Sequence, residues 1–374
     1  MKGWMRALRV LHTEWSDGWG GQEIRILSEC LGLAARGHGV ELAGCPEGEL
    51  RRRAQGVGLV FHPLPMAGPW DLRAVWRLAR LLRRREVDIL HTHSSVDSWV
   101  GGLAARLAGV ACVRTRHLSA PVNTHPLNFV YRLPQAVITT GEGIRRHLVE
   151  DYGLPGERVI SIPTGVDLVR FRPREPDPRL RAELGLGPEE PVVGMVAVLR
   201  SWKRHDLFCR MARMLLDRGR RARFLIVGDG PGRERVGGYL DEMGLRPAVS
   251  MTGHREDVER ILSLCSVVVL CSDRNEGVPQ AVLQAMACAR PVVAAAAGDV
   301  PQVVRDGRTG LLVPPGEVEP LARAVERLLD DPDLRRRLGE AGRRMVKETY
   351  SQEAMLAATE EVYARVLAGK GAKA

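Results

Sequence analysis

The sequence has few of the features that mark several large classes of protein. Aromatic residues make up 5% of the 374 residues, and lysine supplies only five of the 55 basic side chains. No run approaches the roughly 20 apolar residues of a membrane-spanning helix. Residues 1–11 lack the long apolar stretch and the small-residue cleavage site of a signal peptide. We therefore expect a cytoplasmic protein that neither spans a membrane nor is secreted.

Cysteine and histidine form no recognisable disulfide or metal pattern. The seven cysteines include no CxxC pair and lie mostly among apolar residues, as expected for small buried residues in a reducing compartment. His91 and His93 would share a strand face, which permits metal binding, but no third ligand follows at a recognisable spacing. We expect no bound metal.

The order of apolar and amphipathic segments predicts the fold. A strand at 8–11 precedes a glycine loop at 17–21, a helix at 22–36 and a second strand at 40–43. Strands and helices continue to alternate, with further strands predicted at 87–90, 111–115, 136–139, 192–198, 224–227, 249–251, 267–271 and 292–295. This order predicts an α/β protein of two tandem doubly wound, Rossmann-like domains.

The boundary between the two domains is expected near residue 172. Proline, arginine and acidic residues interrupt the alternation there, so 173–190 reads as an exposed linker with a short helix in it. The domains would then be 1–172 and 191–350, with a terminal helix and tail at 351–374. Open α/β sheets bind ligands at the carboxyl ends of their strands, so we expect the site in loops that face a cleft between the domains.

The strongest local signal follows the predicted strand at 267–271. There Glu276-Gly277-Val278-Pro279 leads into a predicted helix, and a helix N-terminus is a ready anion site. A carboxylate beside a bound anion is better explained as an acceptor of hydroxyl hydrogen bonds, as from a sugar. The alternative is that Glu276 only caps the helix.

A second signal is a basic turn after the strand at 192–198. Arg200 and Lys203 would place positive charge at the end of that strand, where fixed cations can neutralise a diphosphate. The alternative is a solvated basic turn. The glycine stretches at 18–21 and 228–232 both miss the GxGxxG spacing, and there is no Walker A loop, so a nicotinamide-dependent enzyme is disfavoured.

Taken together, these residues resemble the GT-B glycosyltransferases, specifically the retaining nucleotide-sugar transferases of family 4. The resemblance covers nearly the whole chain, and the segments that carry it are 20–23, 36–38, 162–167, 228–231 and 276–287. The last segment is the most specific, because family members have two glutamates eight positions apart there.

The resemblance implies roles for individual residues. Glu276 would accept hydrogen bonds from hydroxyls of the donor sugar, and Lys203 with Arg200 would hold the departing diphosphate. His117 would contact the transferred sugar. The other implied contacts to the nucleotide sugar are Gly20 and Gly21 from the first domain, His254 and Arg255 near the base, and Gly228, Gly277, Val278, Pro279 and Gln284.

Two positions depart from the family pattern. Gln284 stands where the second glutamate usually binds ribose hydroxyls. Its amide oxygen can still accept one such bond, so weaker binding of the donor is expected rather than inactivity. The arginine usually found after the first strand of the second domain is replaced by Ala197-Val198, and Arg200 is the expected substitute.

The resemblance also implies the reaction. A sugar leaves a nucleotide diphosphate, with UDP or GDP expected, while the acceptor hydroxyl attacks from the same face, so the anomeric configuration is retained. Family members need no metal or other cofactor, because paired cations do that electrostatic work. No residue stands out as a covalent nucleophile.

The positive charge is concentrated in the first half of the chain. Residues 1–174 carry 24 basic and 16 acidic side chains, and 71–85 alone holds six arginines. In this segment, five apolar residues recur at helical spacing: Leu72, Val75, Trp76, Ala79 and Leu82. Such a helix could lie on an anionic membrane surface. The alternative is an ordinary helix that covers the sheet and exposes its arginines.

These observations leave three functional hypotheses. The first is transfer to a lipid-linked or lipopolysaccharide acceptor at the inner face of the cell membrane, with peripheral membrane contact. Gln284 suggests a second, a sugar-nucleotide-binding protein without transferase activity, and a nucleotide-sugar epimerase of the same fold is the third. Nucleic-acid binding is not supported, because no aromatic stacking platform or helix-turn-helix pattern accompanies the charge.

Overall fold

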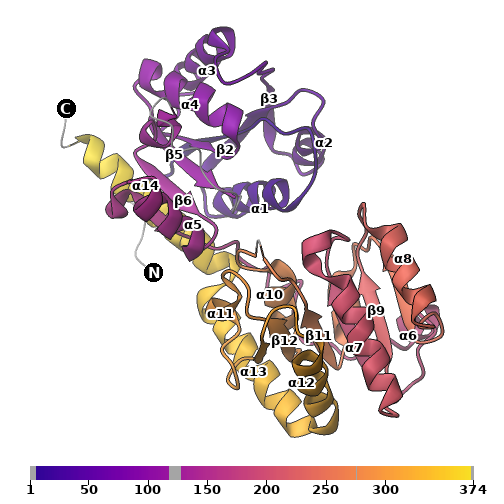
Figure 1. The fold of residues 1–374 in the computed structure, drawn as a ribbon. Coiled ribbons are helices and arrows are strands. Elements are labelled where there is room, and N and C mark those ends of the chain that lie inside the picture. The colour runs from indigo at the N-terminus through magenta and orange to yellow at the C-terminus, as the bar shows by residue number, and fades with distance from the viewer. Residues whose placement is uncertain (1–5, 118–127, 275, 372–374) are drawn as a thin grey trace. The chain divides into compact units, whose positions relative to one another are not determined.

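The computed structural model describes residues 6–117, 128–274 and 276–371. The chain forms two compact units, the first built from Met1–Thr164 and Gln352–Ala374 and the second from Gly165–Ser351. Each unit is a parallel sheet with helices on both faces (Figure 1). The predicted α/β class with two Rossmann-like domains is therefore confirmed.

In the described residues, the sheet of the first unit has seven parallel strands: β1 Arg9–Glu14, β2 Gly39–Gly44, β3 Val60–Pro63, β4 Ile89–Thr92, β5 Ala111–Arg116, β6 Ala136–Thr139 and β7 Val159–Ser161. Their order across the sheet is β3-β2-β1-β4-β5-β6-β7. The sequence pattern located five of these strands. It missed β3 and β7, which are short edge strands and only partly buried.

Helices cover both faces of the first sheet. One face carries α1 Gly21–Ala35, α2 Glu49–Gly56 and α14 Gln352–Gly371. The other carries α3 Leu72–Arg84 and α4 Ser95–Ala108, and the short α5 Glu142–Arg146 packs beside β7. Helix α4 shows how local sequence sets such bounds. It begins at a capping box between Ser94 and Asp97 and ends at Gly109, whose φ is 70°.

The second unit repeats this architecture. Its strands in the described residues are β8 Val192–Val196, β9 Arg223–Val227, β10 Val249–Gly253, β11 Val267–Leu270, β12 Val292–Ala295 and β13 Leu311–Val313. All pairs are parallel, in the order β10-β9-β8-β11-β12-β13. Strands β11 and β12 are buried throughout, as expected for parallel strands covered on both faces.

Two groups of helices enclose the second sheet. One face carries α7 His205–Asp217, α8 Arg233–Glu242 and α12 Val318–Asp330. The other carries α6 Pro178–Glu183, α9 Val258–Leu264, α10 Gln280–Ala287 and α11 Val300–Val303, with α13 Pro332–Thr349 packed against α10.

Both sheets reverse their strand order at one place. In the first sheet β1 lies between β2 and β4, and in the second β8 lies between β9 and β11. The chain leaves the first strand of each pair toward one side of the sheet and the second strand toward the other. Their loops therefore diverge at the carboxyl ends, which is where open α/β sheets bind ligands.

The segment predicted as a linker at 173–190 is an integral part of the second unit. Leu180 of α6 is fully buried, and it packs with Phe171 and Leu186 in a core cluster of that unit. The boundary between the units accordingly follows Thr164 and not residue 172. Proline and charge obscured three core residues that are spaced too widely to form a recognisable pattern.

The C-terminal helix belongs to the first unit. Helix α14 packs against α1 and β5, the hydroxyl of Tyr363 lies 2.7 Å from Nδ1 of His91, and Glu360 bonds to Arg36 and His38 at 2.9 and 3.0 Å. The expected separate segment at 351–374 is thus a return of the chain to its first domain. Residues 372–374 of the predicted tail lie outside the described residues.

Helix α3 buries three of the five apolar residues predicted at helical spacing: Val75, Ala79 and Leu82. Ala74, Leu78 and Leu82 are buried, whereas Leu72 and Trp76 are 71% and 59% exposed. The helix does cover the sheet, as one of the two interpretations expects. Two of the five predicted apolar positions nevertheless lie among the arginines on the solvent side.

None of the helices in the described part of the chain combines the length and apolar character needed to cross a bilayer.

Candidate active site

Two of the predicted site residues meet in the second unit. Nζ of Lys203 donates to Oε1 of Glu276 in an ion pair whose side chains are 17% and 6% exposed. Lys203 ends a short 3-10 turn in the loop after β8, and Glu276 lies in the loop after β11. The pair therefore occupies the point at which the strand order of the second sheet reverses.

The interpretation of Glu276 as a helix cap is wrong. Helix α10 begins at Gln280, and its N-cap is Pro279, without a side-chain capping bond. The carboxylate of Glu276 is bound to Lys203 instead. The buried carboxylate and the partly buried ammonium thus satisfy one another in this structure.

Arg204 holds the two loops together. Its guanidinium donates two bonds to the carboxylate of Asp206, at 2.9 and 2.8 Å, and one to Asp273 at 3.0 Å. The hydrogen bond to Asp206 is the main reason that the pKa of Arg204 is raised. Arg204 has φ 54° and ψ 51°, a left-handed conformation that costs roughly 1–2 kcal/mol for a residue with a Cβ. The ion pairs offset that cost and keep Lys203 beside Glu276.

The backbone of Glu276 is held from a third loop. Its carbonyl oxygen accepts a hydrogen bond from the N–H of Asp299 at 3.0 Å. Gly298 has φ 56°, and a Cβ built there would lie 2.0 Å from that oxygen. Only glycine fits so close to the carbonyl. The loop after β12 can therefore approach Glu276 and hold its backbone in place.

The structure brings two predicted nucleotide contacts together at the ends of β9 and β10. The N–H of Gly228 donates to the carbonyl oxygen of Gly253 at 2.9 Å, and His254 follows directly and is exposed. Gly228 has φ 140°, and a Cβ there would lie 2.1 Å from the carbonyl oxygen of Ala197. Glycine at 228 therefore allows the loops after β8, β9 and β10 to come together.

Arg255 is bound within its own unit. Its guanidinium donates to Asp257 at 2.8 Å and to Glu183 of α6 at 2.7 Å. The hydrogen bond to Asp257, more than that to Glu183, raises its pKa. Any nucleotide contact by Arg255 would have to be made alongside these two ion pairs.

The remaining predicted contacts of this unit surround the start of α10. Gly277 and Val278 are partly exposed, and Pro279 is buried. Gln284 lies one turn further along α10 and is also partly exposed, so its amide can reach a ligand.

Arg200 lies over the ring of a neighbouring tryptophan. It is exposed, and its guanidinium carbon lies 5.2 Å from the ring centre of Trp202. With Arg204, Arg235 and Arg274 it lines a pocket of about 310 Å³ beside the loop after β8. Lys203 is therefore the predicted cation that the structure places on Glu276, and the role of Arg200 stays a prediction.

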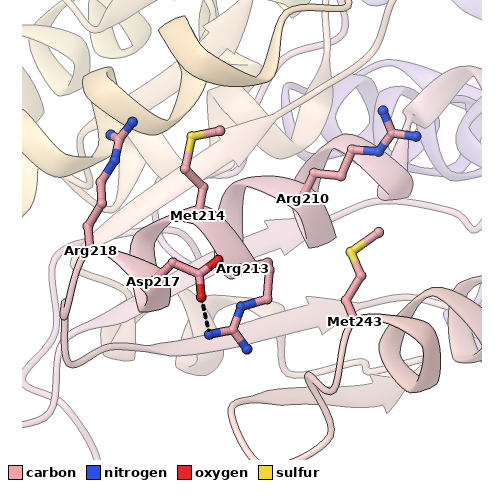
Figure 2. A pocket seen from close by; sticks show the side chains of 6 residues that line it. All are labelled: Arg210, Arg213, Met214, Asp217, Arg218 and Met243. Atoms are coloured by element: carbon pink, nitrogen blue, oxygen red, sulfur yellow. Dashed lines mark ion pairs between the residues drawn. The ribbon is translucent and has the colours of Figure 1, made fainter.

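A second pocket of about 360 Å³ lies on the other side of this unit, between α7 and the end of α8. Figure 2 shows it lined by arginines and two methionines, with Arg213 paired to Asp217 at 2.7 Å. Asp217 and Arg218 lie where α7 ends, just before β9 begins, at the amino ends of the strands. This pocket is thus at the edge of the sheet opposite the candidate site.

In the first unit, the predicted glycines Gly20 and Gly21 stand at the start of α1. The N–H of Gly20 donates to the carboxylate of Glu23 at 2.8 Å, whereas Gly21 is exposed and has open space where a Cβ would be. Glu14, at the end of β1, accepts bonds from the N–H groups of the next two residues. Burial, with Asp97 nearby, raises the pKa of Glu14 to about 8.

Four histidines form a network beneath this loop. His12 on β1 and His91 on β4 are register partners, and His93 and His117 directly follow β4 and β5. Nδ1 of His12 lies 2.9 Å from Nε2 of His93, and Nδ1 of His93 lies 3.1 Å from Nε2 of His117. Burial lowers the pKa of all four, that of His12 to about 3.

Three of these histidines lie close enough together to be considered as ligands of one metal ion. One nitrogen each of His12, His91 and His93 lies within 4.8 Å of the others. Hydroxyls of Thr115 and Tyr363 already occupy both nitrogens of His91, at 2.7 Å each, and His12 is bonded to His93. The geometry is therefore that of a hydrogen-bonded network. The sequence places His12 late in a strand, as it does His91, but it does not identify His12 as a neighbour of His91 and His93, because strand register is not visible in the sequence.

The sequence was compared with protein-family models and with known proteins. Residues 176–345 match the family model "Glycosyl transferases group 1", and residues 19–170 match "Glycosyltransferase Family 4". The chain is 31% identical over 315 residues to the alpha-D-kanosaminyltransferase of Streptomyces kanamyceticus, covering 77% of this chain and 81% of that protein. It is also 31% identical over 361 residues to a D-inositol 3-phosphate glycosyltransferase of Nocardia farcinica, covering 86% and 79%.

Solved structures agree on the fold. A glycosyltransferase of Rickettsia africae superimposes with a TM-score of 0.88 at 20% identity, over 96% of this chain and 99% of that one. Anabaena HepE, crystallised with UDP, superimposes with a TM-score of 0.84 at 19% identity, over 96% and 100%.

The two Rossmann-like units and the site at a strand switch define a GT-B glycosyltransferase. Within that class, the chain belongs to glycosyltransferase family 4, group 1. The family predicted from the sequence motifs is confirmed.

The buried histidines predict an acid-labile protein. Between about pH 6.5 and 3, His12 binds a proton when unfolded but not when folded, so the free energy of unfolding falls as pH falls. Each histidine of this kind contributes about 1.4 kcal/mol per pH unit in that range. Thermal and denaturant unfolding between pH 7.5 and 5 will show this loss.

Replacing one histidine isolates the effect from other titrations, because the raised pKa of Glu14 has the opposite sign. His12→Gln is expected to lower the free energy of unfolding at pH 7.5. On acidification that free energy should then fall less steeply than in wild type, by about 1.4 kcal/mol per pH unit. The control is His147→Gln, at a partly exposed position. Parallel wild-type and His12→Gln curves would contradict the account.

Proposed function

We propose that this glycosyltransferase moves a sugar from a UDP-sugar to an anionic glycolipid or surface-polysaccharide acceptor, with retention of anomeric configuration and without a metal. The observation that carries the proposal is the Lys203–Glu276 ion pair at the switch point of the second sheet. A diphosphate needs a cation, and a sugar needs a hydrogen-bond acceptor. The pair offers both within one contact.

In the free protein the two charges satisfy one another. When the donor binds, the diphosphate forms an ion pair with the ammonium of Lys203, and a sugar hydroxyl donates a hydrogen bond to the carboxylate of Glu276. No charge is left buried without a partner, which would otherwise cost several kcal/mol. As the bond to the diphosphate breaks, negative charge grows on the leaving phosphate, and a fixed cation there stabilises the transition state more than the ground state.

The lysine supplies the charge that a divalent metal supplies in other sugar transferases, and this supports a reaction without metal. Retention is supported by relatives whose names specify α-linked products, among them the kanosaminyltransferase and the N-acetyl-alpha-D-glucosaminyl L-malate synthase of Bacillus anthracis. An α-linked product from an α-configured nucleotide sugar requires retention.

UDP is the favoured nucleotide because HepE, which shares the fold, was crystallised with UDP, with UDP and glucose, and with UDP-glucose. His254 and Arg255 after β10 are the proposed contacts near the base. The other proposed contacts of this unit are Gly228 after β9, Gly277, Val278 and Pro279 just before α10, and Gln284 on α10. For Gly20 and Gly21, contact with the donor stays a prediction from the resemblance, as does contact of His117 with the transferred sugar.

Our proposal for the acceptor rests on exposed residues of α3 and of the loop just before it. Trp70 is 61% exposed, Leu72 71% and Trp76 59%, and the guanidinium carbon of Arg80 lies 5.6 Å from the ring centre of Trp76. Exposed indoles among arginines are typical of segments that lie in the headgroup region of an anionic membrane. We propose that this aromatic–arginine face brings the enzyme to its acceptor in the inner leaflet.

A small soluble polyol is the second candidate acceptor. It is favoured by the relatives, whose names include 2-deoxystreptamine, inositol 3-phosphate and L-malate as the accepting molecules. Membrane contact would then be unnecessary for turnover.

Removing the carboxylate of Glu276 tests the site. Glu276→Ala is expected to lower kcat/KM by about 10²–10³-fold, the usual loss for one stabilising contact in a transition state. Donor hydrolysis in the absence of acceptor should fall as well. Rates are measured by UDP release with a panel of UDP-sugars.

Glu234→Ala is the matched control, because it removes an exposed carboxylate from α8 of the same unit. It should leave rates unchanged. If Glu276→Ala hydrolyses and transfers as fast as wild type, with the same affinity for UDP, Glu276 is not a site residue.

The aromatic–arginine face has its own test. A variant with Trp76→Ala, Arg77→Ala and Arg80→Ala should lose about 100-fold or more in partition onto phosphatidylglycerol vesicles, since each basic residue contributes about 1 kcal/mol near such a surface. Co-sedimentation with phosphatidylcholine–phosphatidylglycerol vesicles measures this partition.

The control removes the same two charges elsewhere, with Arg336→Ala and Arg337→Ala on exposed positions of α13. Equal binding of both variants and wild type to anionic vesicles would eliminate the membrane proposal and leave the soluble acceptor.

A further inference from the structure

The four-histidine network contains a directed chain of hydrogen bonds that ends at a proposed site residue. The chain runs from His12 through His93 to His117, with ring nitrogens 2.9 and 3.1 Å apart. His12 and His93 are 0% and 2% exposed, and His117 is partly exposed at the carboxyl end of β5.

Each ring in this chain is neutral, because burial opposes the charged form of all three. A neutral imidazole has one N–H donor and one acceptor nitrogen. His93 therefore cannot donate at both of its bonds or accept at both. It accepts from one neighbour and donates to the other, so both bonds of the chain run in the same direction.

The far end of the chain decides that direction. Nε2 of His12 is buried and has no hydrogen-bond partner in the described part of the structure. A buried N–H without a partner is more costly and rarer than a buried acceptor without one. The proton of His12 is therefore on Nδ1, which donates to Nε2 of His93. His93 then carries its own proton on Nδ1 and donates to Nε2 of His117.

We infer that His93 is a positioning residue that holds His117 as the Nδ1–H tautomer, so that His117 offers one hydrogen-bond donor to an oxygen of the sugar. The Nε2 lone pair of His117 is occupied by His93, so it does not serve as a general base. The ligand recognised by Nδ1–H is an acceptor oxygen, such as a sugar hydroxyl. This inference rests on the proposed function for the identity of that ligand, but the tautomer itself belongs to the free enzyme.

The tautomer is tested by NMR on the protein labelled with ¹⁵N-histidine. Two-bond ¹H–¹⁵N correlations distinguish a protonated ring nitrogen from an unprotonated one, and His117→Asn assigns the signal. We expect His117 to show a protonated Nδ1 and an unprotonated Nε2 at pH 7. A protonated Nε2, or averaged signals in the wild type, would overturn the inference.

Substitution of His93 tests its influence. His93→Phe keeps the ring but removes the bond, and it should give mixed tautomers at His117 and a 10–100-fold lower kcat, the usual cost of losing a partner that orients a functional histidine. The KM for the UDP-sugar should change little. His93→Asn can still donate from its amide and should recover most of kcat and a single tautomer.

His147→Phe, at a position partly exposed in another part of the unit, is the control. An unchanged tautomer of His117 in His93→Phe would refute the positioning role. Should His93→Phe fail to fold, the wild-type NMR measurement and His93→Asn decide the matter. Full activity of His117→Asn would instead contradict the proposed function of His117 while leaving the tautomer measurement intact.

Discussion

The reversal of strand order in each parallel sheet is the constraint on which the candidate site depends. Because β8 and β11 are neighbours whose connections leave in opposite directions, their loops diverge at the carboxyl edge. Lys203 comes from one loop and Glu276 from the other. The Lys203–Glu276 pair therefore forms where these two loops meet.

The rest of the second unit maintains this arrangement. Arg204 joins the two loops through Asp206 and Asp273, and Gly298 allows a third loop to support the backbone of Glu276. In the first unit the corresponding switch between β1 and β4 is filled by histidines. Two copies of one topology thus carry different chemistry, an ion pair in one and a neutral hydrogen-bond chain in the other.

Much of this could be predicted from the sequence, because parallel strands and their loops follow from local patterns. Lys203 and Glu276 were found as polar residues directly after buried strands. The role of Arg204 was not found, because Asp273, one of its two ion-pair partners, lies 69 positions away in the sequence. The contact between His12 and His93 could not be predicted for a similar reason, since it depends on the register of β1 against β4.

The errors in the fold have physical causes of the same kind. Helical spacing alone could not decide whether Trp76 or Leu78 faces the sheet, and the packing of α3 selected Leu78. The supposed linker hid Leu180 among prolines and charges, although that side chain is fully buried. Both cases show that composition describes exposure on average, while tertiary packing decides it residue by residue.

The central claim is that Lys203, which pairs with Glu276 in the free protein, binds the diphosphate of a nucleotide sugar. Its most direct test is thermal and calorimetric titration of wild type and Lys203→Met with UDP and UDP-sugars, with Arg210→Met on α7 as the control. All three proteins are compared at one UDP-sugar concentration, 100 times the Kd of wild type. At that concentration wild type and the control should be stabilised by about 2.7 kcal/mol, and Lys203→Met should lose most of this stabilisation. Equal stabilisation of all three proteins would contradict it.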